Sequence, residues 1–200
     1  RQRAIMSELS QLNPDLQFTL QTEKYFDFAQ SNIEATEYIR RYNNVTWHKL
    51  PDGSPDLDSI REFYGGYLER KEGYLNQEME EIAPDLILSD FVYEAFDVAA
   101  RKNIPAFGIA HFTWDWFFSK LYPRVLQDDL YDYFVSNAKK AKRIFFPPFT
   151  PTEILAQYKK TAVEVPFIIR KDILHRKWPK TDRLKILIMD SGAGLMANHI

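Results

Sequence analysis

The stretch from residue 83 to residue 118, APDLILSDFVYEAFDVAARKNIPAFGIAHFTWDWFF, constrains the fold more than any other part of the chain. Two short apolar runs, 86–88 and 106–110, flank a segment whose apolar residues have the spacing of a helix with one buried face: Val92, Ala95, Phe96, Ala99 and Ala100. Pro105 ends that helix, because the residue before a proline is pushed out of the α region. Strand, helix and strand of this length form a parallel βαβ unit with a right-handed crossover.

Neither apolar run alternates with polar residues, which is typical of strands in a parallel sheet covered by helices on both faces. The sequence therefore predicts an α/β fold with a Rossmann-like parallel sheet. We expect strands at 86–89 and 106–110 to be adjacent, parallel and buried. We also expect Val92, Phe96 and Ala99 to pack on the sheet.

The remaining chain continues the α/β order. Helical patterns occupy 3–12, 24–30 and 128–141. A further long helical pattern begins at a cap from Asp56 or Asp58 and runs to about 82. Strand patterns occupy 16–22, 45–50, 143–146 and 184–189, whereas 151–164 is expected to be irregular or weakly helical.

Composition narrows the function classes. Hydrophobic residues make up 45% of the 200 residues and aromatic residues 15%, which is enough for a sizeable core. The 26 basic and 28 acidic side chains give a net charge of −2, which argues against a nucleic-acid binder. Basic clusters at 139–143 and 170–180 are interpreted as solvated helix ends or linker, with peripheral contact to an anionic membrane as the weaker alternative. The absence of cysteine excludes disulfides, thiolate metal sites and a cysteine nucleophile.

No signal peptide or membrane-spanning apolar run is recognisable, so we expect a cytoplasmic protein. The chain starts inside a helical pattern and stops just past a glycine loop, which suggests a fragment of a longer protein.

The stretch 83–118 resembles the amino-terminal half of GT-B glycosyltransferases, most of all the branch related to the N-acetylglucosaminyltransferase of peptidoglycan synthesis. Phe112-Thr113-Trp114-Asp115-Trp116 is also similar to the glycosyltransferase-like part ahead of some plant arabinose kinases. The resemblance implies an amino-terminal, acceptor-side domain over 1–176 that lacks its first strand. It also implies a linker at 177–183 and the start of a donor-side domain at 184–200.

The resemblance further implies an enzyme that moves a sugar from a nucleotide-diphosphate sugar to a hydroxyl acceptor, which is a sugar or a lipid-linked molecule. The donor is a substrate, so no cofactor or metal is implied, and this fragment is expected to be inactive alone. Two alternatives stay open. One is a non-catalytic sugar- or nucleotide-binding module, for example fused to a sugar kinase, and the other is a nucleotide-sugar epimerase.

Ligands of open α/β sheets bind beyond the carboxyl ends of the strands, so we examined the residues that follow each predicted strand. His111 is a candidate general base, and Asp115 can orient its imidazole or bind the acceptor. Asp90 is either a helix N-cap or a ligand for a sugar hydroxyl. Thr113 supplies a hydroxyl, and Trp114 either stacks on a sugar ring or joins an aromatic cluster. Structural roles remain the alternative for His111 and Asp115.

The segment 192–197, Gly-Ala-Gly-Leu-Met-Ala, follows the predicted strand 184–189 and matches the G-x-G-x-x-A phosphate-binding pattern. In the GT-B interpretation, Ser191, Gly192 and Gly194 approach the donor diphosphate. The stretch also resembles the start of glutamate-type racemases, but those enzymes use cysteine pairs. The four histidines, at positions 48, 111, 175 and 199, have no metal-ligand spacing, so we predict no metal site.

Overall fold

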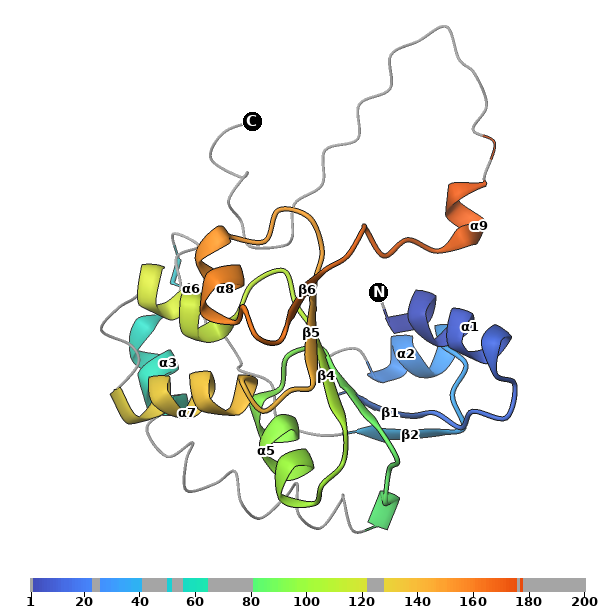
Figure 1. Ribbon diagram of the computed structural model, residues 1–200, viewed down its shortest axis with the longest axis horizontal. Coiled ribbons are helices and arrows are strands. Elements are labelled where there is room, and N and C mark those ends of the chain that lie inside the picture. The colour runs from blue at the N-terminus through green and yellow to red at the C-terminus, as the bar shows by residue number, and fades with distance from the viewer. Residues whose placement is uncertain are drawn as a thin grey trace, which may run out of the picture.

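The computed structural model describes residues 2–22, 26–40, 50–51, 56–64, 81–121, 128–175 and 177. All strands in these ranges are parallel and form two sheets (Figure 1). One sheet pairs β1 (Thr19–Thr22) with β2 (Glu37–Arg40). The other has the order β3 (Ile87–Ser89), β4 (Ala106–Ile109), β5 (Arg143–Phe146) and β6 (Ala162–Glu164). The predicted α/β class with parallel sheets is confirmed.

Most helices of the described ranges form two groups around the four-stranded sheet (Figure 1). On one side lie α5 (Tyr93–Arg101), α6 (Trp114–Leu121), α7 (Asp128–Ala138) and α8 (Thr152–Gln157). Strand order equals chain order from β3 to β6, so right-handed crossovers bring these helices to one face. On the other side lie α1 (Gln2–Leu12) and α2 (Phe26–Asn32), beside the two-stranded sheet. Two further helices are α3 (Leu57–Tyr64) and α9 (Lys171–Leu174).

The helix-covered face of the sheet holds the main core. Phe96 of α5 and Ile144 and Phe146 of β5 are completely or almost completely buried there. Gly108 of β4 faces the same side, and a Cβ atom at this position would lie 3.1 Å from the Phe96 ring and 3.3 Å from Ile144. Glycine at 108 therefore lets α5 approach the sheet closely.

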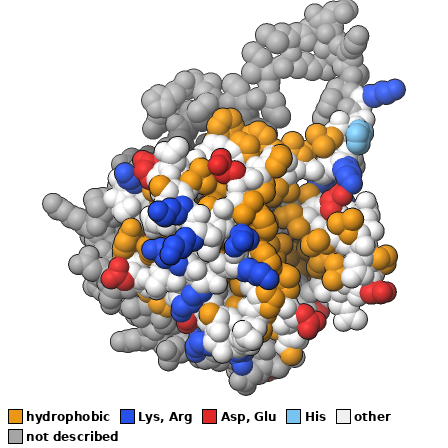
Figure 2. Space-filling view, in the orientation of Figure 1, with side chains coloured by type: hydrophobic (Ala, Val, Ile, Leu, Met, Phe, Trp, Pro, Cys, Tyr) orange, Lys and Arg blue, Asp and Glu red, His pale blue; other side chains and the backbone are white. Residues whose placement is uncertain are grey.

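The opposite face of the same sheet is apolar but less covered by the described residues. Phe107 and Phe145 stack there with ring centroids 6.1 Å apart, and Val163 follows in the register. Figure 2 shows hydrophobic side chains running along the molecule between the main body and the α1 side. Leu88 is 39% exposed on this face, and Val92, which precedes α5, is 41% exposed. The strands β3 and β4 are adjacent and parallel as predicted, but full burial of 86–89 was wrong, because the described helices from the crossovers cover only one face. The expected packing of Val92 on the sheet was also wrong, because Val92 lies at the N-cap, before the first turn of α5.

The edge of β3 away from β4 is not paired with any other described strand. The backbone N–H of Ile87 donates to the carbonyl of Pro105, 3.0 Å away, so the backbone polar groups of Ile87 point toward β4. Hydrogen-bonding direction alternates along a strand, so the backbone groups of Leu88 point to the other edge.

The other expected elements differ in detail. The helix 3–12 and the strand 143–146 are confirmed as α1 and β5, and the helix predicted at 128–141 ends at Ala138. The segment 151–164 contains the short helix α8, in line with the weakly helical expectation, but the strand β6 was not predicted there, and neither was β2. Pairing with β5 explains β6: Ile144 N–H donates to Thr161 at 2.8 Å, and Val165 N–H donates to Phe146 at 3.0 Å.

Asp56 caps α3, since its Oδ1 accepts the backbone N–H groups of Asp58 at 3.1 Å and Ser59 at 3.2 Å. The continuation of this helix over 65–80 lies outside the described residues, as do nearly all of the predicted strand 45–50 and the segment 178–200 with the expected linker and second domain.

Candidate functional site

The carboxyl edge of the four-stranded sheet carries the candidate site. Ser89 of β3 is level with Gly108 of β4, so the residues that follow the two strands leave at the same edge. Asp90 follows β3, His111 follows β4, and both are exposed. No described residue hydrogen-bonds to the His111 imidazole, so the ring is free to meet a ligand at this edge.

Asp90 is not the N-cap of α5. Val92 occupies the N-cap position without a side-chain cap, and its backbone N–H donates to Ser89 Oγ at 2.8 Å. The chain passes through Phe91 with a φ of 65°, in the left-handed region, so the helix starts later than capping by Asp90 requires. Asp90 instead accepts a hydrogen bond from Gln2 Nε2, which holds the start of α1 at the carboxyl edge.

Asp115 lies four residues beyond His111 but is completely buried. Its Oδ1 accepts the Tyr93 hydroxyl at 2.6 Å, and its Oδ2 accepts Gln157 Nε2 at 2.9 Å. The Tyr93 hydroxyl also accepts the Asp115 backbone N–H at 3.2 Å. The carboxylate therefore ties the first turn of α6 to α5 and α8, and a ligand cannot touch it in this conformation.

Two phenols beside Asp115 are kept protonated. Burial raises the pKa of Tyr93 well above its usual range, and the negative charge of Asp115 raises it further. Burial is also the main cause that raises the pKa of Tyr158, again followed by the Asp115 carboxylate. Both hydroxyls thus stay neutral donors around a buried charge, which is the arrangement that a buried carboxylate needs.

Thr113 and Trp114 lie inward from His111. Thr113 is completely buried, its Oγ1 has no hydrogen-bond partner, and its carbonyl accepts Phe117 N–H at 2.9 Å. Trp114 packs in an aromatic cluster, with ring centroids 5.2 Å from Phe112 and 5.8 Å from Phe118. The cluster interpretation of Trp114 fits this geometry, and an acceptor cannot reach Thr113 unless the segment moves.

Sequence reasoning missed two aromatic residues at the same edge. Phe149 follows β5 and is 91% exposed, and Phe167 follows β6 and is 52% exposed. Their ring centroids are 5.8 Å apart. Prolines in the sequence could have indicated these residues. Pro147 and Pro148 follow β5, Pro166 follows β6, and all three restrict the backbone beside the two phenylalanines.

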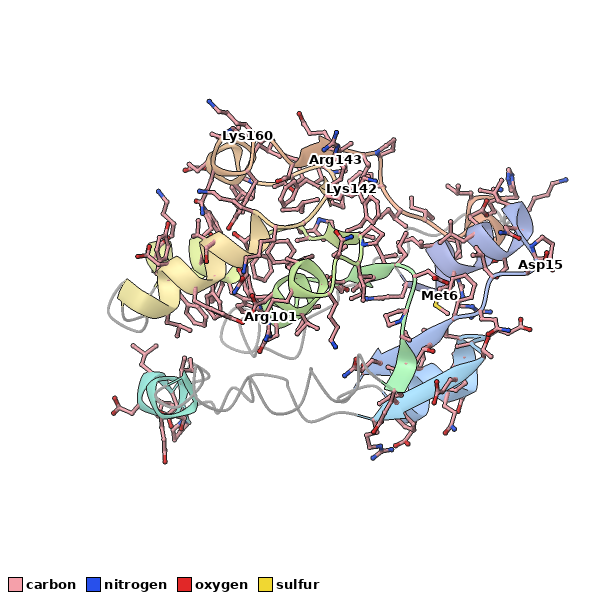
Figure 3. The ribbon with its side chains drawn as sticks, turned by 60° about the horizontal axis from the view of Figure 1, so that its bottom comes forward. Met6, Asp15, Arg101, Lys142, Arg143 and Lys160 are labelled. Carbon is pink, nitrogen blue, oxygen red and sulfur yellow. The ribbon has the colours of Figure 1, made fainter. Side chains whose placement is uncertain are left out.

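The opposite, amino edge of the sheet is basic. Arg101 ends α5, Lys142 and Arg143 lie where α7 leads into β5, and Lys160 precedes β6 (Figure 3). Asp97 binds Lys140 at 2.7 Å and Arg101 at 3.3 Å. Cations at helix ends interact favourably with the helix dipole, in agreement with the solvated helix end expected at 139–143.

The donor-side residues Ser191, Gly192 and Gly194 lie outside the described residues. Within the described ranges, no group of three or more histidine, aspartate or glutamate side chains is arranged to hold a metal ion. None of the helices in those ranges has the length and apolar character required to cross a membrane. No protein-family model matches the chain, and no curated protein is significantly similar to it.

Proposed function

We propose that this chain is the acceptor-side part of a GT-B type glycosyltransferase that moves a sugar from a nucleotide-diphosphate sugar to a hydroxyl acceptor. The observation that supports the proposal is the pair of exposed polar side chains, Asp90 and His111, after two adjacent parallel strands. Ligands of such sheets bind at this edge.

In the proposed reaction, the His111 imidazole takes the proton from the acceptor hydroxyl. The hydroxyl oxygen forms a bond to the anomeric carbon of the donor, and the bond from that carbon to the diphosphate breaks. The diphosphate leaves with the electron pair, stabilised by backbone amides such as those expected at 191–194. Asp90 binds a second hydroxyl and fixes the orientation of the acceptor.

Asp115 has a different role in this proposal from the one that its position in the sequence suggested. Its carboxylate is occupied by Tyr93 and Gln157, so it neither contacts the acceptor nor orients the imidazole. It positions the start of α6, and thereby the segment that carries His111.

One observation favours the second candidate function, a non-catalytic sugar-binding module. With Asp115 buried, no carboxylate of the described residues hydrogen-bonds to His111, and general bases are often supported by such a partner. The module would use the same edge to bind a sugar without transfer.

The test uses the intact protein that contains this chain. It is incubated with a panel of nucleotide-diphosphate sugars, and release of nucleoside diphosphate is measured for wild type, His111→Ala and His175→Ala. His175 is exposed at the end of α9 and serves as a matched control. We expect His111→Ala to lower turnover about 10²- to 10⁴-fold and His175→Ala to leave it unchanged. Nucleotide-sugar binding without turnover in wild type would favour the module.

A further inference from the structure

We infer that Phe149 and Phe167 form a binding platform for the apolar, alkyl or aryl part of the acceptor, beside the sugar-binding edge. The inference rests on the proposed function in one respect, because that function makes the ligand an acceptor. Binding of the apolar group itself does not require sugar transfer. Nothing in the sequence patterns assigned a role to either residue.

The exposure of the pair is the first argument. Most apolar side chains of this size are largely buried in folded proteins, whereas Phe149 is 91% exposed and Phe167 is 52% exposed. Ile169, two positions beyond Phe167 in the chain, is also exposed. A contiguous exposed apolar patch is typical of an interaction site.

The way in which the chain holds Phe149 is the second argument. Its φ is 70°, in the left-handed region that bulky residues avoid. Pro147, Pro148 and Pro151 restrict the backbone on both sides, and Thr150 Oγ1 donates to the Pro147 carbonyl at 2.8 Å. The loop therefore fixes the backbone that carries the ring, so little backbone entropy is lost when a ligand binds.

The third argument is the distance from His111 along the edge. β5 lies directly between β4 and β6, and Ala110 N–H donates to Phe145 at 3.2 Å at the end of that pairing. Neighbouring strands lie about 4.8 Å apart, so the loop after β5 leaves the sheet one strand spacing from the segment that carries His111. The platform and His111 therefore belong to adjacent loops at one edge of the sheet.

The chemistry of the patch selects the occupant. The segments 147–150, Pro-Pro-Phe-Thr, and 165–169, Val-Pro-Phe-Ile-Ile, contain no charged residue. Phenyl rings offer no hydrogen bond to sugar hydroxyls or phosphates, and the basic side chains Arg101, Lys142 and Lys160 lie at the opposite edge. The platform therefore suits an uncharged, apolar group and not a phosphate or another charged group.

The experiment compares methyl, hexyl and phenyl glucoside, which share one sugar and differ in the apolar group. Binding to the intact protein is measured by calorimetry without any donor, for wild type, Phe149→Ser and Phe28→Ser. Phe28 on α2 is 63% exposed and is the matched control. Because each fully buried methylene strengthens binding about fourfold, we expect hexyl and phenyl glucoside to bind at least about tenfold more tightly than methyl glucoside. Phe149→Ser should remove most of that difference, and Phe28→Ser should preserve it.

Equal binding of the three glucosides, or a difference that survives in Phe149→Ser, would overturn the inference. So would sedimentation showing that wild type self-associates through Phe149 and releases the patch only in Phe149→Ser, because a second copy of the chain would then be the occupant. Since no donor is present, a failure of sugar transfer contradicts the proposed function alone. Failure of the glucoside series contradicts the platform alone.

Discussion

Two neighbouring regions at the carboxyl edge differ in almost every physical property. The buried network consists of Tyr93, Asp115, Gln157 and Tyr158, and the exposed edge consists of Asp90, His111, Phe112, Phe149 and Phe167. The first holds a carboxylate inside the protein with its hydrogen bonds provided by phenol and amide donors. The second presents an imidazole, a carboxylate and aromatic rings to solvent. The difference indicates that stability depends on the network, whereas the proposed ligand binding uses the exposed edge.

The largest effect is expected for Asp115→Ala. The substitution removes the carboxylate that accepts from the buried Tyr93 hydroxyl and from the part-buried Gln157 amide, and hydrogen bonds to charged groups contribute about 1.5–3 kcal/mol each. We expect the free energy of unfolding, measured by urea denaturation, to fall by about 3 kcal/mol. Asp90→Ala is the control and should change it by less than about 0.5 kcal/mol. Similar effects of the two substitutions would remove the distinction between the regions.

The second largest effect is expected from alkaline pH, which should weaken the buried network. The folded-state pKa of Tyr93 and Tyr158 is raised above the unfolded value of about 10, so above that pH the unfolded state has lost protons that the folded state retains. The stabilising contribution is complete below about pH 10 and declines above it, by about 1.4 kcal/mol per pH unit for each retained proton. Urea denaturation from pH 8 to 11 should show a smaller decline in Tyr93→Phe than in wild type. Parallel pH curves would mean that Tyr93 ionises equally in both states.

Gly108→Ala tests the packing beneath both regions. The added methyl group would meet Phe96 at 3.1 Å and Ile144 at 3.3 Å, so these side chains must shift by a few tenths of an ångström. We expect the free energy of unfolding to fall by about 1 kcal/mol. An alanine that is tolerated without loss would show that α5 can move away from β4.

The smallest effect, and one of opposite sign, is expected for Phe149→Gly. Glycine removes the left-handed strain at φ 70°, but it also increases the entropy of the unfolded chain. The net change should be a gain of about 0.5 kcal/mol in the free energy of unfolding, measured by thermal denaturation. A clear loss of stability would assign Phe149 to the fold and not to binding.

The sequence predicted the unit from β3 to β4 because its strands, helix and proline stop are local patterns. It did not predict which residues of that unit are buried: Leu88 is exposed although it lies in an unalternating apolar run, and Val92 is exposed although it lies one helical turn before Phe96. Periodicity defines a face, and only the crossovers determine whether helices cover it. β6 was missed because a three-residue strand depends on its partner β5 for its formation.

The same limit applies to the candidate site. His111 was correctly expected after the second strand of the unit, and its exposure follows from that position. Asp115 is nearby in sequence, but α6 begins at Trp114 and turns the carboxylate inward to Tyr93. The partners Tyr93 and Gln157 lie 22 and 42 positions away along the chain, so no local pattern indicates them.

The edge of β3 has a practical consequence for handling the protein. Along Leu88 the described chain offers backbone donors and acceptors beside half-exposed leucine side chains, without a lysine, a proline or a bulge in the strand to discourage pairing. Any preparation in which this edge stays uncovered contains a template for intermolecular strand addition. Its colloidal stability should then fall steeply with protein concentration, and an additional strand along β3 should restore it.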